Sequence, residues 1–191
     1  MARGPVDFSR RCPRCIFPRE ACICGVVQPV ATRTRFLVLR HASELARPTN
    51  SARWAALALP NLTIADYALL DAPLDVASLV EPGDAILFPS PHPPRLDPPP
   101  ARVLVLDGTW AQARRMIQRV PALQALPRIA VPAPSVRAAD PMRRPTIRGG
   151  ISTIEAIAAA LHLLGEPEAA RALEALHAEA LARGWRLRRP G

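Results

Sequence analysis

The sequence contains no lysine. All 25 residues in the combined lysine and arginine count are arginines, and with 16 acidic residues the formal net charge is +9. Alanine and proline are also abundant, which points to a compositional bias and weakens any argument from arginine number alone. A net positive charge nevertheless attracts polyanions, and arginine contacts phosphate in a bidentate manner. We therefore expect nucleic acid as the partner.

Long apolar runs, a secretory leader and nucleotide-binding glycine motifs are also lacking. No stretch approaches the length needed to cross a bilayer, and residues 1–11 lack the apolar segment of a signal peptide. There is no P-loop, and Gly149-Gly150 is not a G-x-G-x-x-G fingerprint. We expect a cytoplasmic protein, monomeric or homodimeric, with no membrane partner. Its 191 residues allow one domain with a substantial core and a small appendage.

All four cysteines lie within 13 residues, in the pattern C-x2-C-x6-C-x-C: Cys12, Cys15, Cys22 and Cys24. Two close pairs can place four thiolates around one tetrahedral zinc ion, and closure by four cysteines is typical of structural sites. A reducing compartment argues against two disulfides, and unrelated free thiols rarely cluster in this way. We therefore predict a zinc knuckle over residues 1–30. Its arginines serve either as an RNA contact or as an ordinary solvated surface.

The remaining residues, 31–191, alternate short apolar runs with amphipathic patterns. This alternation predicts an α/β domain in which a mostly parallel sheet is flanked by helices. The expected strands cover residues 35–41, 63–70, 85–88, 102–106 and 128–131, and the expected helices cover 52–59, 111–117, 152–164 and 167–184. Residues 132–150 follow no regular pattern and contain four arginines. Long irregular segments inside compact domains are usually functional or disordered, and these arginines favour a phosphate or nucleic-acid role.

The stretch Asp107-Gly108-Thr109-Trp110 follows an expected buried strand and precedes an expected helix. Asp107 should therefore lie at the carboxyl end of a strand, where open α/β sheets bind ligands. Thr109 and Gln112 have the spacing of a capping box. Taken alone, the stretch is more typical of an ordinary strand-to-helix turn, because aspartate and glycine are common turn residues.

Two other polar segments occupy similar places. His41, Arg47 and Asn50 follow the first expected strand, although helix capping explains Asn50 without any function. Ser152 and Glu155 form a second capping-box pattern at the start of a helix. The backbone amides there either hold an anionic group or simply begin the helix.

Five motifs in order resemble the DTW-domain family. They are the paired cysteines, His41-x-x-Glu44-x-x-Arg47-x-Thr49-Asn50, Leu87-Phe88-Pro89, Asp107-Gly108-Thr109-Trp110 and Ser152-Thr153-Ile154-Glu155-Ala156. No single motif is decisive, whereas their shared order is. The chain departs from the family after Ser135, where an aromatic residue followed by arginine is usual but Val136-Arg137 stands here, with Arg143 and Arg144 further on.

The resemblance implies a tRNA-uridine aminocarboxypropyltransferase. Such an enzyme moves the 3-amino-3-carboxypropyl group of S-adenosylmethionine to N3 of a tRNA uridine and leaves 5′-methylthioadenosine. It also implies kinship with the SPOUT methyltransferases, whose α/β domain has a C-terminal knot that holds the cofactor. Two alternatives are a SPOUT-like RNA methyltransferase and a non-catalytic, zinc-containing RNA-binding protein.

Residue roles follow from the resemblance and the expected positions. Asp107 is expected to act as the general base at N3 or to bind the cationic amino group of the cofactor. Trp110 either stacks on a base or fills the core. We expect the cofactor to contact Phe88, Pro89, Gly108, Thr109, Trp110, Ser152, Thr153 and Glu155, and tRNA to contact His41, Arg47, Asn50, Arg114, Arg115, Arg143 and Arg144.

Overall fold

A five-stranded parallel sheet forms the centre of the protein. The computed structural model describes residues 9–93, 97–132 and 150–188. The strands are β1 (Arg35–His41), β2 (Leu62–Tyr67), β3 (Asp84–Leu87), β4 (Arg102–Asp107) and β5 (Arg128–Ile129), in the order β2-β1-β4-β3-β5. Every adjacent pair is parallel. This confirms the predicted α/β class, and each strand overlaps its predicted range.

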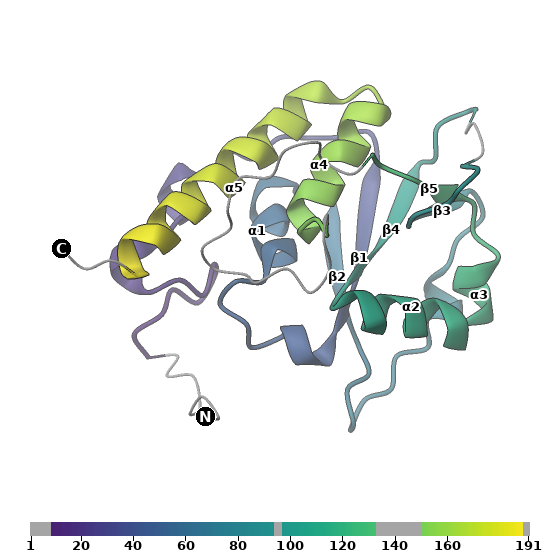
Figure 1. Ribbon diagram of the computed structural model, residues 1–191, viewed down its shortest axis with the longest axis horizontal. Coiled ribbons are helices and arrows are strands. Elements are labelled where there is room, and N and C mark those ends of the chain that lie inside the picture. Colours follow the sequence, from purple (N-terminus) through teal and green to yellow (C-terminus); the bar gives the residue numbers. More distant parts are fainter. Residues whose placement is uncertain (1–8, 94–96, 133–149, 189–191) are drawn as a thin grey trace.

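Helices cover both faces of the sheet (Figure 1). The helices α1 (Ser51–Ala58), α4 (Thr153–Leu163) and α5 (Pro167–Arg188) pack against one another on one face, and α2 (Trp110–Arg119) and α3 (Pro121–Gln124) lie on the other. Short 3-10 turns are η1 (Arg19–Ala21), η2 (Cys24–Val26), η3 (Ala42–Glu44) and η4 (Ala77–Leu79). None of the described helices is both long and apolar enough to span a membrane.

Local sequence explains most element boundaries. The central strands β1 and β4 are continuous apolar runs because both of their faces are buried, as is typical of parallel sheets. Capping boxes begin α2 at Thr109 and α4 at Ser152, as predicted. Strand β2 ends at Tyr67, earlier than predicted, and the next residue, Ala68, has a left-handed φ of 63°.

Helix α5 corrects the prediction that the last helix ends near Gly184. It continues to Arg188, so Trp185 is helical and does not begin a tail. The apolar face of Leu173, Leu176 and Ala180 extends at helical spacing to Gly184, which is itself buried. Tertiary packing of this face outweighs the low helix propensity of glycine.

The described part of residues 1–30 shares its core with the sheet. Cys15, Phe17 and Ile23 are buried in the same cluster as Phe36 of β1. The ring of Phe17 lies 5.3 Å from that of Trp54 in α1. The cysteine-rich segment is therefore packed against the helix that follows β1. The predicted knot depends on residues 133–149, which lie outside the described residues.

The strand order creates a switch point between β1 and β4. From β1 the chain passes through α1 to β2 on one side of the sheet. From β4 it passes through α2 and α3 to β5, beyond β3 on the other side. Open α/β sheets bind ligands at the carboxyl ends of such strands. Here that place is occupied by His41 and Asp107.

Candidate functional site

Asp107 lies at the carboxyl end of β4 and is almost fully buried, with 1% of its surface exposed. The side-chain amide of Asn50 donates to its Oδ2 at 2.5 Å, and the hydroxyl of Thr153 donates to its Oδ1 at 2.6 Å. The carboxylate thus joins β4, the start of α1 and the start of α4. A buried carboxylate needs such donors to offset its lost hydration.

Asn50 is equally buried and has two functions in the fold. Its Oδ1 accepts from the amide of Arg53 and caps α1, while its Nδ2 donates to Asp107. We expected Asn50 to contact RNA. The structure instead places it beneath the site, where it orients Asp107 and is shielded from an RNA backbone.

The start of α4 is already satisfied within the protein. Glu155 accepts from the amide and hydroxyl of Ser152, and its own amide donates to Ser152 Oγ. The amide of Ile154 donates to Ser51 Oγ at 3.4 Å. Of the two uses left open for these amides, capping is the one seen in this structure, and the Ile154 amide also ties α4 to α1.

His41 and Gln112 form a second polar cluster beside Asp107. Gln112 Nε2 lies 3.3 Å from His41 Nδ1 and 3.0 Å from Ser43 Oγ. Gly108 permits this approach, because a Cβ at that position would lie 3.3 Å from the Cβ of His41 and 3.1 Å from Gln112 Oε1. Burial lowers the pKa of His41, and the positive charge of Arg115 lowers it further.

An aromatic pair joins the ends of β3 and β4. Phe88 and Trp110 are half-buried and stack with ring centroids 5.2 Å apart and an interplanar angle of 3°. The guanidinium of Arg114 lies 5.9 Å from the Trp110 ring, and that of Arg128 lies 5.4 Å from Phe88. We expected Trp110 either to stack on a base or to fill the core. Because its ring is half-buried and stacked on Phe88, it does not fill the core. Pro89, the next residue, is exposed.

Sequence reasoning missed a half-buried ion pair at the same edge. Arg40, 7% exposed, is paired in register with Asp107 and forms a bidentate salt bridge to Asp66 at 2.6 and 3.0 Å. A charged residue inside the apolar run of β1 was the available signal. Arg53 lies close by; burial lowers its pKa, and its buried Nη1 has no hydrogen-bond partner among the described residues.

The arginines expected to contact tRNA differ in their surroundings. Arg114 and Arg115 are exposed on α2. Arg47 is exposed as well and forms a 3.3 Å ion pair with the buried Glu44. Arg143 and Arg144 lie outside the described residues.

The four cysteines converge as predicted. Their sulfur atoms all lie within 4.8 Å of one another. The Sγ–Sγ distances are 3.6 Å for Cys12 and Cys24, and 3.8 Å for Cys15 and Cys22. A tetrahedral zinc ion with bonds of about 2.3 Å places its sulfur ligands about 3.8 Å apart. The donor set therefore fits zinc and leaves no ligand position open for a substrate.

The thiols also differ in proton affinity. Burial raises the pKa of Cys15 and Cys24. Burial acts in the same direction on Cys12, but hydrogen bonds from backbone amides and neighbouring thiols outweigh it and lower the pKa to about 6. One thiolate is thus favoured in the cluster before any metal binds.

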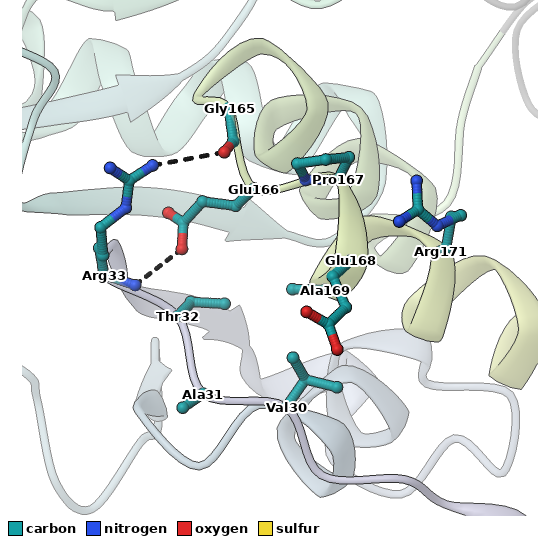
Figure 2. Close-up of a pocket in the computed structure, with 10 residues that line it drawn as sticks. All are labelled: Val30, Ala31, Thr32, Arg33, Gly165, Glu166, Pro167, Glu168, Ala169 and Arg171. Carbon is teal, nitrogen blue, oxygen red and sulfur yellow. Dashed lines mark hydrogen bonds between the residues drawn. The ribbon is translucent and has the colours of Figure 1, made fainter.

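A hollow of about 650 Å³ lies at the opposite edge of the sheet, between the segment before β1 and the turn from α4 to α5. Figure 2 shows Glu166 there, which accepts from the amide of Arg33 at 2.7 Å, and the Arg33 side chain, which donates to the carbonyl of Gly165 at 3.3 Å. The amide of Thr34 also donates to Glu166. These contacts fasten the entry to β1, and the hollow is remote from the carboxyl ends of the strands.

Comparisons with known proteins agree with the motif order. The model of the DTW domain matches residues 9–183. A curated relative, the tRNA-uridine aminocarboxypropyltransferase A of Arabidopsis thaliana, is 28% identical over 131 residues, which cover 56% of this chain and 50% of the relative. The chain thus spans about half the length of that relative. No solved structure matches. Because the domain match covers nearly the whole chain, the protein belongs to the DTW-domain family.

Proposed function

We propose that the protein transfers the 3-amino-3-carboxypropyl group of S-adenosylmethionine to N3 of a uridine in tRNA. The observation that carries this proposal is the buried cluster of Asp107, Asn50 and Thr153 at the switch point of a DTW-domain sheet. The relative's name states both the acceptor and the transferred group. The net charge of +9 suits a polyanionic acceptor.

Asp107 is the proposed acceptor of the N3 proton. A carboxylate offers about four lone-pair sites, two on each oxygen. Here Asn50 occupies one site on Oδ2 and Thr153 occupies one site on Oδ1. The fixed hydrogen bonds hold the remaining sites in one orientation, as a general base requires. In the alternative role, the same carboxylate binds the amino group of the donor. The sulfonium of the donor is a good leaving group, so most of the rate enhancement comes from positioning.

The two substrates are proposed to meet at the carboxyl edge. The donor lies against Phe88, Pro89, the Gly108-Thr109-Trp110 turn and the start of α4. The tRNA contacts the exposed arginines of α2, Arg114 and Arg115, together with His41 and Arg47. The aromatic pair of Phe88 and Trp110, flanked by guanidinium groups, has the chemistry of a stacking platform for an unpaired base.

The four cysteines are proposed to hold a structural zinc ion. The ion joins the two halves of the knuckle, which packs through Phe17 onto Trp54 of α1. Because α1 begins at Asn50, this packing fixes the helix that supplies one donor to Asp107. The metal thereby stabilises the site without contacting a substrate.

Asp107→Asn tests the chemical part of the proposal. We expect the variant to bind S-adenosylmethionine and to lose transfer, because an amide cannot take the proton. Binding is measured by calorimetry, and transfer by nucleoside mass spectrometry of tRNA that lacks the modification. Near-normal turnover would contradict the base role. Loss of donor binding together with turnover would favour the role as an anchor for the amino group.

A SPOUT-like RNA methyltransferase is the principal competing function, because it uses the same donor. It differs in which carbon of the sulfonium is attacked. The mass of the modified nucleoside separates the two, since an aminocarboxypropyl adduct is much heavier than a methyl adduct.

A further inference from the structure

His41 is the last residue of β1, one position beyond the residue paired with Asp107. Its ring is half-buried and lies 6.4 Å from that of Tyr67 in β2. The proton arrangement of this ring follows from its neighbours. Two of these neighbours have a fixed orientation: the backbone amide of Ser43, and the side chain of Gln112, which is held by the backbone amide of Thr109.

The backbone amide of Ser43 points at His41 Nδ1 with an N–N distance of 3.2 Å. A backbone N–H can only donate, so Nδ1 must accept. Ser43 Oγ also lies 3.0 Å from Nδ1 and can turn its hydroxyl toward it. The backbone contact requires an unprotonated Nδ1, and the hydroxyl contact is compatible with it.

The orientation of Gln112 leads to the same conclusion. Its Oε1 accepts from the backbone amide of Thr109 at 2.7 Å, as part of the capping box of α2. This bond settles which end of the side-chain amide is oxygen, so the NH2 group faces His41 Nδ1 at 3.3 Å. The capping box that begins α2 therefore also directs a donor at the histidine.

A neutral histidine with an accepting Nδ1 carries its proton on Nε2. The positive charge of Arg115 from α2 favours the neutral form of the ring, and Tyr67 from β2 packs beside it. Burial acts in the same direction and lowers the pKa. Within residues 9–93, 97–132 and 150–188, nothing accepts a hydrogen bond from Nε2. An Nε2–H donor thus remains available at the switch point.

We propose that this Nε2–H group donates a hydrogen bond to a carbonyl oxygen of the target uracil and stabilises the negative charge that develops there. The proposal rests on the proposed function. When the N3–H bond breaks, its proton passes to the base and the electron pair on N3 is shared with O2 and O4. N3 then forms a bond to the methylene carbon, the carbon–sulfur bond breaks, and its electron pair stays on sulfur. His41 keeps its proton throughout.

This role specifies the tRNA contact expected for His41, and it differs from a contact with phosphate. A phosphate contact would favour a protonated, cationic ring. A general base would need a free lone pair on Nε2. A neutral Nε2–H donor aimed at developing negative charge is electrostatic catalysis, in which one donor commonly contributes about 10²–10³-fold to turnover.

The tautomer is tested first, on the protein without substrates. Nitrogen-15 NMR of the imidazole at pH 7 should show Nε2 protonated and Nδ1 unprotonated. A ring protonated on Nδ1, or on both nitrogens, would overturn the proposal. Because no substrate is present, this result is independent of the proposed function.

Gln112→Glu is the sharpest variant. A glutamate still accepts from the amide of Thr109 and keeps the capping box. It replaces the donor at Nδ1 by an acceptor, so we expect the neutral ring to carry its proton on Nδ1 and to lose the Nε2–H donor. At a pH where the ring is neutral, transfer should fall by about tenfold or more, with an unchanged melting temperature. Unchanged transfer accompanied by Nδ1 protonation would contradict the proposal.

His41→Phe and His41→Gln complete the test. Phenylalanine keeps a ring without a donor and should reduce kcat by about 10²-fold or more, whereas glutamine keeps an N–H donor and should recover part of that loss. The affinity for S-adenosylmethionine should stay unchanged in both, and the loss should persist in kcat at saturating tRNA. A loss confined to tRNA affinity, or a fully active His41→Phe, would contradict the role. If the wild-type protein forms no aminocarboxypropyl adduct, the proposed function fails instead.

Discussion

The hydroxyl of Thr153 donates a 2.6 Å hydrogen bond to Asp107, which lies 46 residues earlier in the chain. Asn50 donates to the other oxygen of the same carboxylate from the opposite direction in sequence. Three segments that carry the family's motifs are thus joined at one buried charge. Three of the five motifs are therefore linked physically, because each of these three supplies one participant in this cluster.

Thr153→Val should weaken this junction. Valine has a shape similar to threonine but no hydroxyl, so one oxygen of the buried Asp107 loses its donor. Hydrogen bonds to charged groups contribute about 1.5–3 kcal/mol, and we expect a loss of that size in the free energy of unfolding. Chemical denaturation measures it, with Thr153→Ser as the control that keeps the hydroxyl. Equal stability of the two variants would contradict the contact.

Gly108→Ala should disturb the His41 cluster. Its Cβ would lie 3.1 Å from Gln112 Oε1 and 3.3 Å from the Cβ of His41, which is backbone-attached and cannot rotate away. We expect a loss of about 1–3 kcal/mol in unfolding free energy and a lower kcat. Gly25→Ala is the matched control, because a Cβ there meets nothing within 4 Å. If Gly108→Ala matches Gly25→Ala in unfolding free energy and kcat, the close approach of His41 and Gln112 to residue 108 is not needed.

Arg114 and Arg115 should contribute to tRNA affinity through phosphate. Replacing either residue by glutamine should flatten the plot of log affinity against log salt by roughly 0.7–0.9 for each lost phosphate contact. Arg171→Gln is the control, because Arg171 is exposed near the hollow at the opposite edge of the sheet. An unchanged slope in the α2 variants, or an equal change in the control, would reject this surface.

Removal of zinc should destabilise the whole protein and not only its first residues. Cys15 and Phe17 are buried in the main core, so loosening of the knuckle exposes Trp54. With free zinc at about 100 times its Kd, the ion contributes about 2.7 kcal/mol. Metal analysis should find one zinc per chain, and chelation should lower the melting temperature and expose four reactive thiols. A purified protein without zinc whose Tm is insensitive to chelators would contradict this role.

The stability of the fold should depend on the ionisation of His41. Its pKa in the folded protein lies below the ordinary value of 6.5, because of burial and Arg115. Between these two pKa values the unfolded chain binds more protons, so stability rises with pH. The contribution is complete above pH 6.5 and is lost as the pH falls through the folded pKa. The unfolding free energies of the wild type and His41→Gln, measured between about pH 5 and pH 8, should converge as the pH falls. A difference that stays constant, or that grows as the pH falls, would refute this contribution of His41.

The sequence predicted the strands and the two capping boxes because these depend on local patterns. The end of α5 depended on a partner surface, so Gly184 was misleading as a stop signal. Helix capping is one of the two explanations that the sequence supports for Asn50, and the structure confirms it. Its bond to Asp107, however, joins residues 57 positions apart and leaves no local pattern. The same holds for the stack of Phe88 on Trp110 and for the convergence of Ser43 and Gln112 on His41.

The proposed function depends first on the identity of the transferred group. The direct test incubates the wild-type protein with S-adenosylmethionine and tRNA that lacks the modification, followed by nucleoside mass spectrometry. We predict a uridine that carries a 3-amino-3-carboxypropyl group on N3, together with release of 5′-methylthioadenosine. A methylated nucleoside with release of S-adenosylhomocysteine, or tRNA that binds but stays unmodified, would contradict the proposed function.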